Sequence, residues 1–228
     1  MGDCIRLTTS NRSILIDEKM FDFSEKKEYV FEFGKAYALI GDFGFGGHLI
    51  SSLMTNECNV IDERILVNSR EDRDYFKNNG WRIGQSVYTK ILKRERKIHD
   101  ILIALKKNEK YDEIIRYFEI DDSLLPETIS SMPHEKWRVS TAVGLLMNRT
   151  VFGLPYMNSR FLYDVFYSSG NLLSIEKIKE FGGLVIIPTN DKDLVSPIVD
   201  ETVILDNSQF DGIKQYAKKQ LERLGVKQ

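Results

Sequence analysis

The chain has 228 residues, of which 42% are hydrophobic and 29% are charged, and its formal net charge is −2. These values fit a globular protein large enough to bury a full core, and they exclude a net positive field that would attract nucleic acid. No apolar run reaches the roughly 18–20 residues that a membrane-spanning helix needs, and the N-terminus lacks the hydrophobic core of a signal peptide. We therefore expect a cytoplasmic protein that does not itself insert into a membrane.

The potential metal-binding and nucleophilic side chains are scattered along the chain. Cys4 and Cys58 have no metal or redox spacing, so we expect two free thiols in a reducing compartment. His48, His99 and His134 are equally dispersed. Cys58 and His48 could form a nucleophile pair, but no third orienting group is evident. The sequence therefore predicts no metal site and no nucleophilic centre.

The first third of the chain consists of short apolar segments typical of strands. The run Tyr37–Ile40 is continuous and apolar, as expected for a strand buried on both faces. It leads through a glycine-rich turn into a predicted helix, His48–Met54. A polar excursion at 68–80 follows. The other predicted strands here are 5–7, 13–16, 29–33 and 60–67, and the core is expected to include Tyr75, Phe76 and Trp81.

From residue 90 to about 149 the pattern becomes helical, with apolar residues three and four positions apart. The basic stretch Lys93–Lys97 is predicted to lie on a solvated helix face. Strand character then returns, and the C-terminal residues 212–225 have the pattern of an amphipathic helix. The predicted helices are 92–105, 111–120, 135–147 and 174–181, and the predicted strands are 151–154, 183–188 and 201–206. This order predicts one domain, 1–228, with an α/β core (1–87 and 150–228) and a helical subdomain (88–149).

Four stretches carry a resemblance to a known family. "YALIGDFGFGGHL" has the strand, glycine turn and helix of a phosphate-binding loop, with Gly41, Gly44 and Gly46 at glycine positions. Three more stretches follow it: "WRIGQSVY", "SMPHEKWRVSTAVGLLMNRTVFGLPYMNSRFL" and "VIIPTNDKDLVSPIVDETVILD". In this order they resemble the Walker A, Q-loop, signature-to-Walker-B and switch-histidine segments of the ATPase subunit of ABC transporters.

The resemblance implies an α/β, P-loop NTPase-like ABC ATPase fold. Its parts are a RecA-like core lobe, an N-terminal antiparallel β-subdomain and an inserted helical lobe. An ABC ATPase works as a head-to-tail pair, in which each nucleotide lies between the Walker motifs of one subunit and the signature of the other.

This sequence departs from the family pattern wherever the family binds phosphate or magnesium. Gly47 stands at the position of the Walker A lysine, and His48 and Leu49 stand at the two hydroxyl positions. Pro155 aligns with the Walker B aspartate and Tyr156 with the carboxylate that polarises water. Neither replacement can accept a proton from water at neutral pH.

The remaining motifs differ too. Leu162 aligns with the D-loop aspartate, and Asn190 aligns with the switch histidine. The Q-loop glutamine falls nearest Tyr88, although Gln85 could substitute for it. The signature Ser-Gly-Gly becomes 132–134, Met-Pro-His. Because one lost electrostatic group typically costs about 10²–10³ in rate, we expect no catalytic residues and no ATP hydrolysis.

Binding without hydrolysis is a separate possibility. Gly41, Gly44, Gly46 and Gly47 leave the backbone free to approach an anion, and His48 could add a weak cation. Asp42, within the same loop, opposes this binding. We therefore favour no cofactor, and ATP with Mg²⁺ is the disfavoured alternative.

The preferred hypothesis is a pseudo-ATPase: a catalytically degenerate ABC-type subunit of a bacterial transporter complex. Its expected partners are an integral-membrane permease, a second ABC ATPase subunit, or both, which would hold it at the inner face of the cell membrane. The coupling helix of a permease would dock near Tyr88–Lys97. The partner-binding residues are then Tyr88, Lys90, Lys93 and Arg94. The compact spacing of the motifs resembles that of small bacterial peptide-export or bacteriocin-immunity ATPases.

Three alternatives remain. The chain could be a soluble scaffold or regulatory protein that reuses the fold away from any membrane. It could be a nucleotide sensor that binds without hydrolysis. The least favoured alternative is an active ATPase with relocated residues, for example Glu135 or Asp164.

Overall fold

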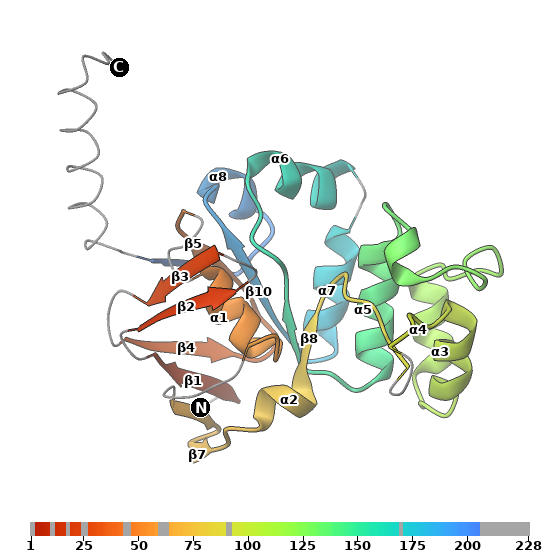
Figure 1. Ribbon diagram of the computed structural model, residues 1–228, viewed down its shortest axis with the longest axis horizontal. Helices are drawn as coiled ribbons and strands as arrows, with labels where there is room; N and C mark the ends of the chain where they lie inside the picture. Colours follow the sequence, from red (N-terminus) through yellow and green to blue (C-terminus); the bar gives the residue numbers. More distant parts are fainter. Residues whose placement is uncertain are drawn as a thin grey trace, which may run out of the picture.

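The computed structural model of the chain contains two sheets and a helical insert (Figure 1). It describes residues 3–9, 12–16, 19–23, 27–42, 47–58, 64–89, 93–168 and 171–205. Within these ranges, no helix is both long enough and apolar enough to cross a bilayer.

The centre of the molecule is a parallel sheet with the strand order β11-β5-β10-β9-β8. Every residue of β10 is buried, which agrees with its continuous apolar run. Because the strands are parallel, their carboxyl ends meet at one edge of the sheet. The strands are β5 (Ala36–Ile40), β8 (Gly80–Arg82), β9 (Val151–Gly153), β10 (Leu184–Thr189) and β11 (Glu201–Ile204).

An antiparallel sheet with the order β4-β1-β6-β7 covers helix α1 (Gly47–Met54), which lies between the two sheets (Figure 1). Along β1, Ile5 and Leu7 are fully buried while their neighbours are only half-buried, so one face of the strand packs on the core. Phe31 meets Tyr37 edge-on, with ring centroids 5.1 Å apart. The strands are β1 (Cys4–Thr8), β4 (Glu28–Glu32), β6 (Arg64–Val67), β7 (Arg70–Glu71) and the separate pair β2 (Arg12–Ile16) and β3 (Lys19–Phe23).

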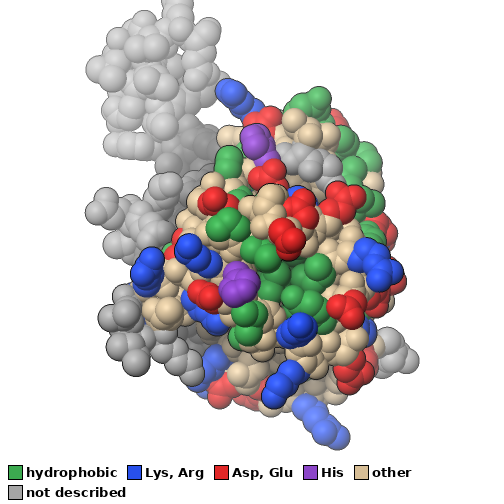
Figure 2. Space-filling view, turned by 90° about the vertical axis from the view of Figure 1, so that its right-hand side faces the viewer, with side chains coloured by type: hydrophobic (Ala, Val, Ile, Leu, Met, Phe, Trp, Pro, Cys, Tyr) green, Lys and Arg blue, Asp and Glu red, His purple; other side chains and the backbone are tan. Residues whose placement is uncertain are grey.

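A helical insert separates β8 from β9 in the chain. Its buried residues belong to the same hydrophobic cluster as those of the parallel sheet, for example Ile98 and Val143 with Phe152 and Ile187. The insert therefore shares a continuous core with the sheet. Figure 2 shows its outer face, where hydrophobic side chains gather at the centre and charged side chains surround them. The insert contains α3 (Ile98–Leu105), α4 (Tyr111–Tyr117), the 3-10 turn η1 (Ile129–Ser131) and α5 (Lys136–Leu146).

The other helices flank the sheet. They are α2 (Tyr75–Asn79), α6 (Ser159–Leu162), the π-helical turn η2 (Tyr163–Ser168), α7 (Leu172–Glu180) and α8 (Lys192–Val195).

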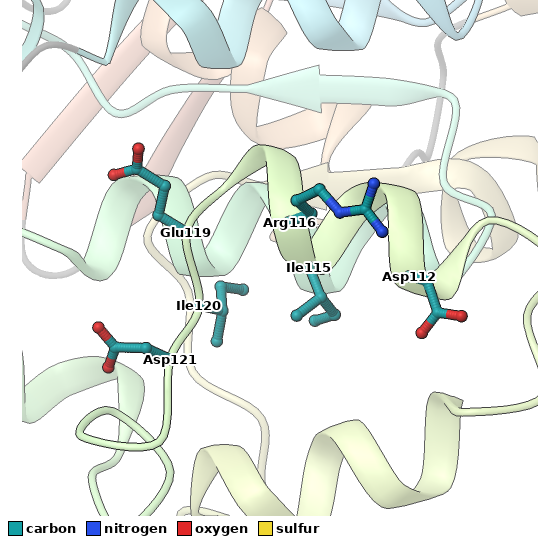
Figure 3. Close-up of a pocket in the computed structure, with 6 residues that line it drawn as sticks. All are labelled: Asp112, Ile115, Arg116, Glu119, Ile120 and Asp121. Carbon is teal, nitrogen blue, oxygen red and sulfur yellow. The ribbon is translucent and has the colours of Figure 1, made fainter.

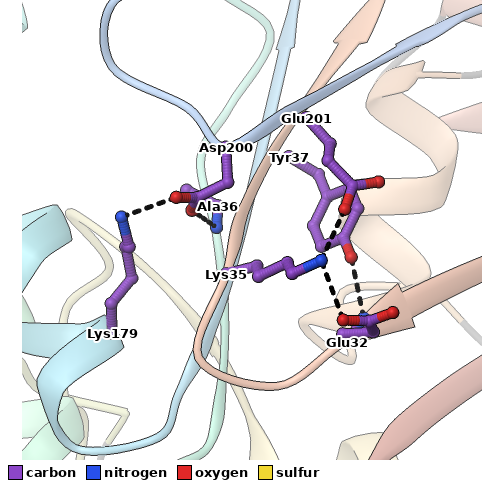
Figure 4. A network of polar contacts seen from close by, with 7 residues as sticks. All are labelled: Glu32, Lys35, Ala36, Tyr37, Lys179, Asp200 and Glu201. Carbon is purple, nitrogen blue, oxygen red and sulfur yellow. Dashed lines mark hydrogen bonds and ion pairs between the residues drawn. The ribbon is translucent and has the colours of Figure 1, made fainter. Parts of the chain in front are cut away.

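A polar network ties the amino-terminal end of β5 to its neighbours (Figure 4). Lys35 Nζ lies 2.7 Å from Glu201 Oε1 and 2.8 Å from Glu32 Oε2. The Asp200 carboxylate accepts a hydrogen bond from the backbone N–H of Ala36 at 2.7 Å and one from Lys179 at 2.9 Å. The network joins β11, β5, the end of β4 and α7, and so connects the parallel sheet to the antiparallel one.

The fold class predicted from the sequence is confirmed: an α/β core with a parallel sheet, an antiparallel β-subdomain and an inserted helical lobe. The boundaries proposed at 88 and 149 remain predictions. Phe76 and Trp81 are buried as expected, while Tyr75 is half-buried and its hydroxyl lies 3.1 Å from Thr150 Oγ1. The predicted C-terminal helix lies outside the described residues.

One helix prediction was wrong. Residues 93–97 are not helical, because α3 begins only at Ile98 and Lys93 has a φ of 50°. Instead, Tyr88 pairs with Glu95 in an antiparallel bridge, so this stretch is part of a hairpin. The stretch has no apolar side chain to bury, and the Glu95 carboxylate accepts the backbone N–H of Ser130 at 2.9 Å, which favours the hairpin.

The polar excursion at 68–80 was also incompletely predicted, because it contains β7 and helix α2. Helix α2 spans only five residues and buries one large side chain, Phe76, which is too short a stretch to show a helical period. Strand β3, helices α6 and α8 and the π-helical turn were not predicted. They span only four to six residues each, which is too few to show a clear period.

Candidate functional site

Three loops meet at the carboxyl edge of the parallel sheet. The backbone N–H of Gly41, after β5, donates to the carbonyl oxygen of Thr189 at 2.9 Å. Met157, beyond β9, forms a parallel bridge with the same Thr189. The structure thus brings Gly41, at the start of the glycine turn, close to the strand end before Asn190 and to the segment that follows Pro155.

Helix α1 begins in this edge with a buried glycine. A Cβ on Gly47 would lie 3.1 Å from Leu205 Cδ1 and 3.4 Å from both Leu39 Cβ and Pro188 Cβ. A longer side chain there would have to displace these apolar groups. His48 is half-buried, whereas Leu49 is fully buried in the core below the antiparallel sheet. The predicted phosphate-loop residues Gly44 and Gly46 lie outside the described residues.

The segment after β9 contacts α1 and caps α6, and the positions of the two Walker B carboxylates hold a proline and a tyrosine. The hydroxyl of Ser51 on α1 donates to the carbonyl oxygen of Leu154 at 2.8 Å. Pro155 and Tyr156 are half-buried. Farther along, Asn158 caps α6 by accepting the N–H of Phe161 at 2.9 Å. Leu162, at the D-loop aspartate position, is fully buried, so this position belongs to the hydrophobic core.

The loop after β10 likewise uses its acidic group for structure. Asn190, at the switch-histidine position, is exposed. Asp191 caps α8 by accepting the N–H of Leu194 at 2.9 Å. That bond, followed by one from the Ser159 hydroxyl, lowers the pKa of the Asp191 carboxyl. The carboxylate is therefore engaged in tying α8 to α6.

The sequence of the glycine turn carries few charged groups. Residues 41–50 contain one aspartate and one histidine, and neither lysine nor arginine. In the part of the chain that the structure describes, no three His, Cys, Asp or Glu side chains converge as metal ligands. A triphosphate needs cations or a magnesium ion held by hydroxyl and carboxylate oxygens, and the aligned positions carry neither.

A second candidate site is an open groove beside β8, with a volume of about 660 Å³. Its walls come from both lobes: Trp137 of α5 meets Phe161 of α6 edge-on, with ring centroids 5.7 Å apart. Lys136 Nζ lies 4.7 Å from the centre of the Trp137 ring. The groove is lined by Glu57, Arg82, Ile83, Gly84, Gln85, Ser86, Tyr88, Lys136, Trp137, Pro155 and Phe161.

The loop that leaves β8 is shaped by one glycine and one serine. Gly84 has a φ of +88°, and a Cβ there would lie 2.8 Å from Trp137 Cζ3, so only glycine fits. Its N–H donates to Ser140 Oγ at 2.9 Å, while the indole N–H of Trp81 donates to the Ser140 carbonyl oxygen at 2.9 Å. Ser140 therefore fastens the start of this loop to α5.

Three of the four partner-binding residues predicted from sequence are described, and they lie in or next to the pairing between 88–89 and 94–95. Tyr88 lines the groove and is 56% exposed. Lys93 and Arg94 are exposed, and the N–H of Arg94 donates to Thr89 Oγ1 at 3.2 Å across the hairpin. Lys90 lies outside the described residues. Sequence reasoning missed Trp137 and Phe161, because nothing in the two helices marks them as facing each other.

The hairpin is also fixed to the insert. Burial raises the pKa of Glu95, but hydrogen bonds from Ser130, Ser86 and Thr128 outweigh burial, so the pKa lies below its usual value. An ionised Glu95 thus holds the 128–130 loop against the base of the hairpin.

A separate hollow of about 360 Å³ lies on α4 (Figure 3). Ile115 and Ile120 point into it, Asp112 and Asp121 lie at its ends, and Arg116 points away from it. It contains no residue of the parallel sheet and is distinct from both candidate sites.

Comparison with known proteins identifies the fold. No family model matches the sequence, and no curated protein matches it. Among solved structures, the chain is similar to CbiO1 of Clostridium perfringens, part of the ABC transporter complex CbiONQ. The identity is 15% over 98% of this chain and 97% of that one, with a TM-score of 0.63.

Two further cassettes give the same result. MJ0796, a bacterial ABC transporter cassette solved as a dimer, is 11% identical over 89% of this chain and 94% of its own, with a TM-score of 0.62. The ADP conformation of MJ1267, an ATP-binding cassette of an ABC transporter, is 12% identical over 91% of this chain and 89% of its own, also with a TM-score of 0.62. The chain therefore has the fold of the ATP-binding cassettes of ABC transporters.

Proposed function

We propose that the chain is a pseudo-ATPase, a catalytically degenerate ABC-type subunit of a bacterial transporter complex. It serves as the structural or regulatory partner of an integral-membrane permease, of an active ABC ATPase, or of both. The observation that carries this proposal is the carboxyl edge of the sheet. There, the positions that the resemblance assigns to phosphate and metal chemistry hold no lysine and no carboxylate, and three of them, Gly47, Leu49 and Leu162, are buried.

The expected loss of catalytic rate supports a subunit that does not hydrolyse ATP. Two unit charges 4 Å apart attract by about 4 kcal/mol at an effective dielectric constant near 20, and Gly47 supplies no such charge to a phosphate. Each missing electrostatic group costs about 10²–10³ in rate, and such losses are not additive. Even a sub-additive total leaves little catalysis once the lysine, the metal ligands and the water-polarising carboxylate are absent.

The groove supports the partner role. Its aromatic walls, Trp137 and Phe161, and its exposed Tyr88 are of the residue types that dominate interface energetics. An amphipathic helix is a common occupant of such a groove, and a cytoplasmic helix of a permease has this form. The compact spacing of the motifs favours a small peptide-export or bacteriocin-immunity system.

The test is co-purification from detergent-solubilised bacterial membranes with the tagged chain, followed by identification of the captured proteins. We expect a permease or an intact ABC ATPase to be retained, and Tyr88→Ser to reduce its recovery. Tyr163→Ser is the matched control, because Tyr163 is 54% exposed, outside the groove. Recovery of the chain only in the soluble fraction would instead favour a scaffold role, and ATP turnover by the isolated chain would refute the proposal.

A further inference from the structure

The insert is joined to the core by a buried lysine. Lys177 on α7 is only 5% exposed, and its Nζ lies 2.7 Å from Glu113 Oε1 on α4 and 3.1 Å from Glu180 Oε2. The same ammonium group lies 4.5 Å from the centre of the Tyr117 ring and 5.0 Å from that of Phe181. One cation therefore binds a carboxylate and an aromatic ring of the insert while it remains part of the core.

The neighbouring lysine on the same helix has a different partner. Lys179 lies 2.9 Å from Asp200 Oδ1, and Asp200 precedes β11 in the core. Both lysines are paired, but only Lys177 reaches the insert. This difference provides an internal control for any effect of losing a lysine from α7.

From Lys177 the contacts continue to one wall of the groove. The Tyr117 hydroxyl donates to the carbonyl oxygen of Leu173 at 3.1 Å, which adds a second tie between α4 and α7. After α4 ends, the carbonyl oxygens of Phe118 and Glu119 accept hydrogen bonds from Arg138 Nη1 on α5, the latter at 2.9 Å. Arg138 directly follows Trp137, the wall residue contributed by the insert.

The second aromatic residue of the groove, Phe161, connects to the same lysine through the core. Phe161 lies in α6, and the π-helical turn η2 follows that helix. Asn171, which is 4% exposed, donates through Nδ2 to the carbonyl oxygen of Val165 at 2.9 Å and so attaches the start of α7 to this turn. The contacts thus form a closed ring that runs from Phe161 through α7, α4 and α5 to Trp137.

We propose that Lys177 is a positioning residue that presets the groove: by holding α4 on α7, it fixes how Trp137 packs against Phe161 in the lining of the groove, in the absence of any nucleotide. This inference rests on the proposed function, because it concerns the partner-docking groove. A preformed groove has a physical advantage for a subunit without ATP chemistry, since a partner then does not have to order it on binding.

The charge state of Lys177 is consistent with this role. Burial lowers its pKa, but the hydrogen bonds to Glu113 and Glu180 more than compensate, so the pKa lies above its usual value and the group stays protonated at neutral pH. The two carboxylates have side chains 52% and 64% exposed. Water can therefore solvate them if the lysine is removed, and Lys177→Met should still fold, with its thioether against the aromatic rings.

The experiment uses the full chain labelled with 5-fluorotryptophan. The chain has two tryptophans, so ¹⁹F NMR gives two resonances, and Trp137→Phe assigns the one from the groove. We expect Lys177→Met to shift or split the Trp137 resonance and to speed amide hydrogen exchange in 111–117 at least tenfold. Lys179→Met should leave both readouts as in the wild type, although it also removes an ion pair from α7.

The inference is overturned if Lys177→Met leaves the Trp137 resonance unchanged, or if Lys179→Met alters it equally. A separate arm adds Mg-ATP to the wild-type chain. A shift of the Trp137 resonance in that arm would contradict the proposed function, whatever the lysine variants show. If Mg-ATP leaves the wild-type spectrum unchanged and Lys177→Met has the same ¹⁹F spectrum as the wild type, only the positioning role of Lys177 is refuted.

Discussion

Replacing Ser140 by alanine tests how the groove loop is fastened to the insert. Ser140 is fully buried, and its hydroxyl oxygen accepts the N–H of Gly84 at 2.9 Å. In the alanine variant, the Trp81 indole can still donate to the Ser140 backbone carbonyl, which it already contacts at 2.9 Å. The group left without its acceptor is therefore the backbone N–H of Gly84, a residue against which the Trp137 ring packs closely.

The size of the effect follows mainly from the bond to Gly84, because the other two bonds of the hydroxyl, from Trp81 Nε1 at 3.2 Å and to the Gln85 carbonyl oxygen at 3.4 Å, are longer. Leaving a buried donor unsatisfied costs about 1–3 kcal/mol, and the half-buried position of Gly84 places the expected loss at about 1–2 kcal/mol. For a chain of this size, each kcal/mol lowers the melting temperature by about 2–4 °C. We therefore expect Ser140→Ala to melt about 2–8 °C below the wild type.

Urea denaturation and thermal melting of the two proteins measure the difference. Thr141→Val is the matched control, because Thr141 is also fully buried on α5, but its hydroxyl donates only to the Trp137 carbonyl one turn earlier in the same helix. We expect this control to lose less than half as much stability as Ser140→Ala. Equal losses in the two variants, or a loss below about 0.5 kcal/mol for Ser140→Ala, would refute the assigned role of Ser140.

Three further variants test separate parts of the structure. Gly144→Ala should lose about 1–3 kcal/mol in urea titration despite its better helix propensity, because the new Cβ would lie 2.6 Å from Trp81 and 2.7 Å from Phe152. Asp200→Asn should flatten the fall in stability between about pH 5 and pH 3, measured by thermal melting at each pH. Burial raises the pKa of Asp200, but its hydrogen bonds hold the pKa below its usual value, so its contribution is present above the unfolded pKa of about 3.9 and is lost as the pH falls through the folded pKa. Tyr88→Ala should change stability by less than about 0.5 kcal/mol, because the side chain is 56% exposed, yet weaken partner retention.

Each of these predictions has a contrary outcome. A Gly144→Ala protein as stable as the wild type would show that α5 can shift away from β8. If the wild type and Asp200→Asn lose stability equally as the pH falls, Asp200 does not contribute to the pH dependence of stability. Unfolding caused by Tyr88→Ala would mean that the tyrosine supports the hairpin rather than a partner.

The sequence predicted the elements that contain a long, continuous run of apolar residues. The run in β10 is apolar because both faces of the strand are covered, and the helix predicted at 135–147 is present as α5. The buried strand before the glycine turn and the helix after it were predicted correctly and are present as β5 and α1. Leu162 aligns with an acidic position of the family motif. Its side chain is hydrophobic, which agrees with its burial in the core.

The sequence could not predict features that depend on distant pairs. Lys177 looks like an ordinary charged residue of a surface helix, and its burial depends on Glu113 and Tyr117, about 60 residues earlier. The facing walls of the groove, Trp137 and Phe161, belong to two helices that have no recognisable joint pattern. The hairpin around Tyr88 was mistaken for the start of a helix, because its cross-strand bridge leaves no periodic signal.

Isothermal titration of the full chain with Mg-ATP tests the central claim most directly, with an intact ABC cassette as the positive control. The account predicts no saturable heat at millimolar nucleotide, because residues 41–50 contain neither lysine nor arginine and the aligned metal positions hold neither a carboxylate nor a hydroxyl of serine or threonine. Magnesium-dependent binding at one site per chain, with a dissociation constant near 1 μM or about −8 kcal/mol, would contradict it.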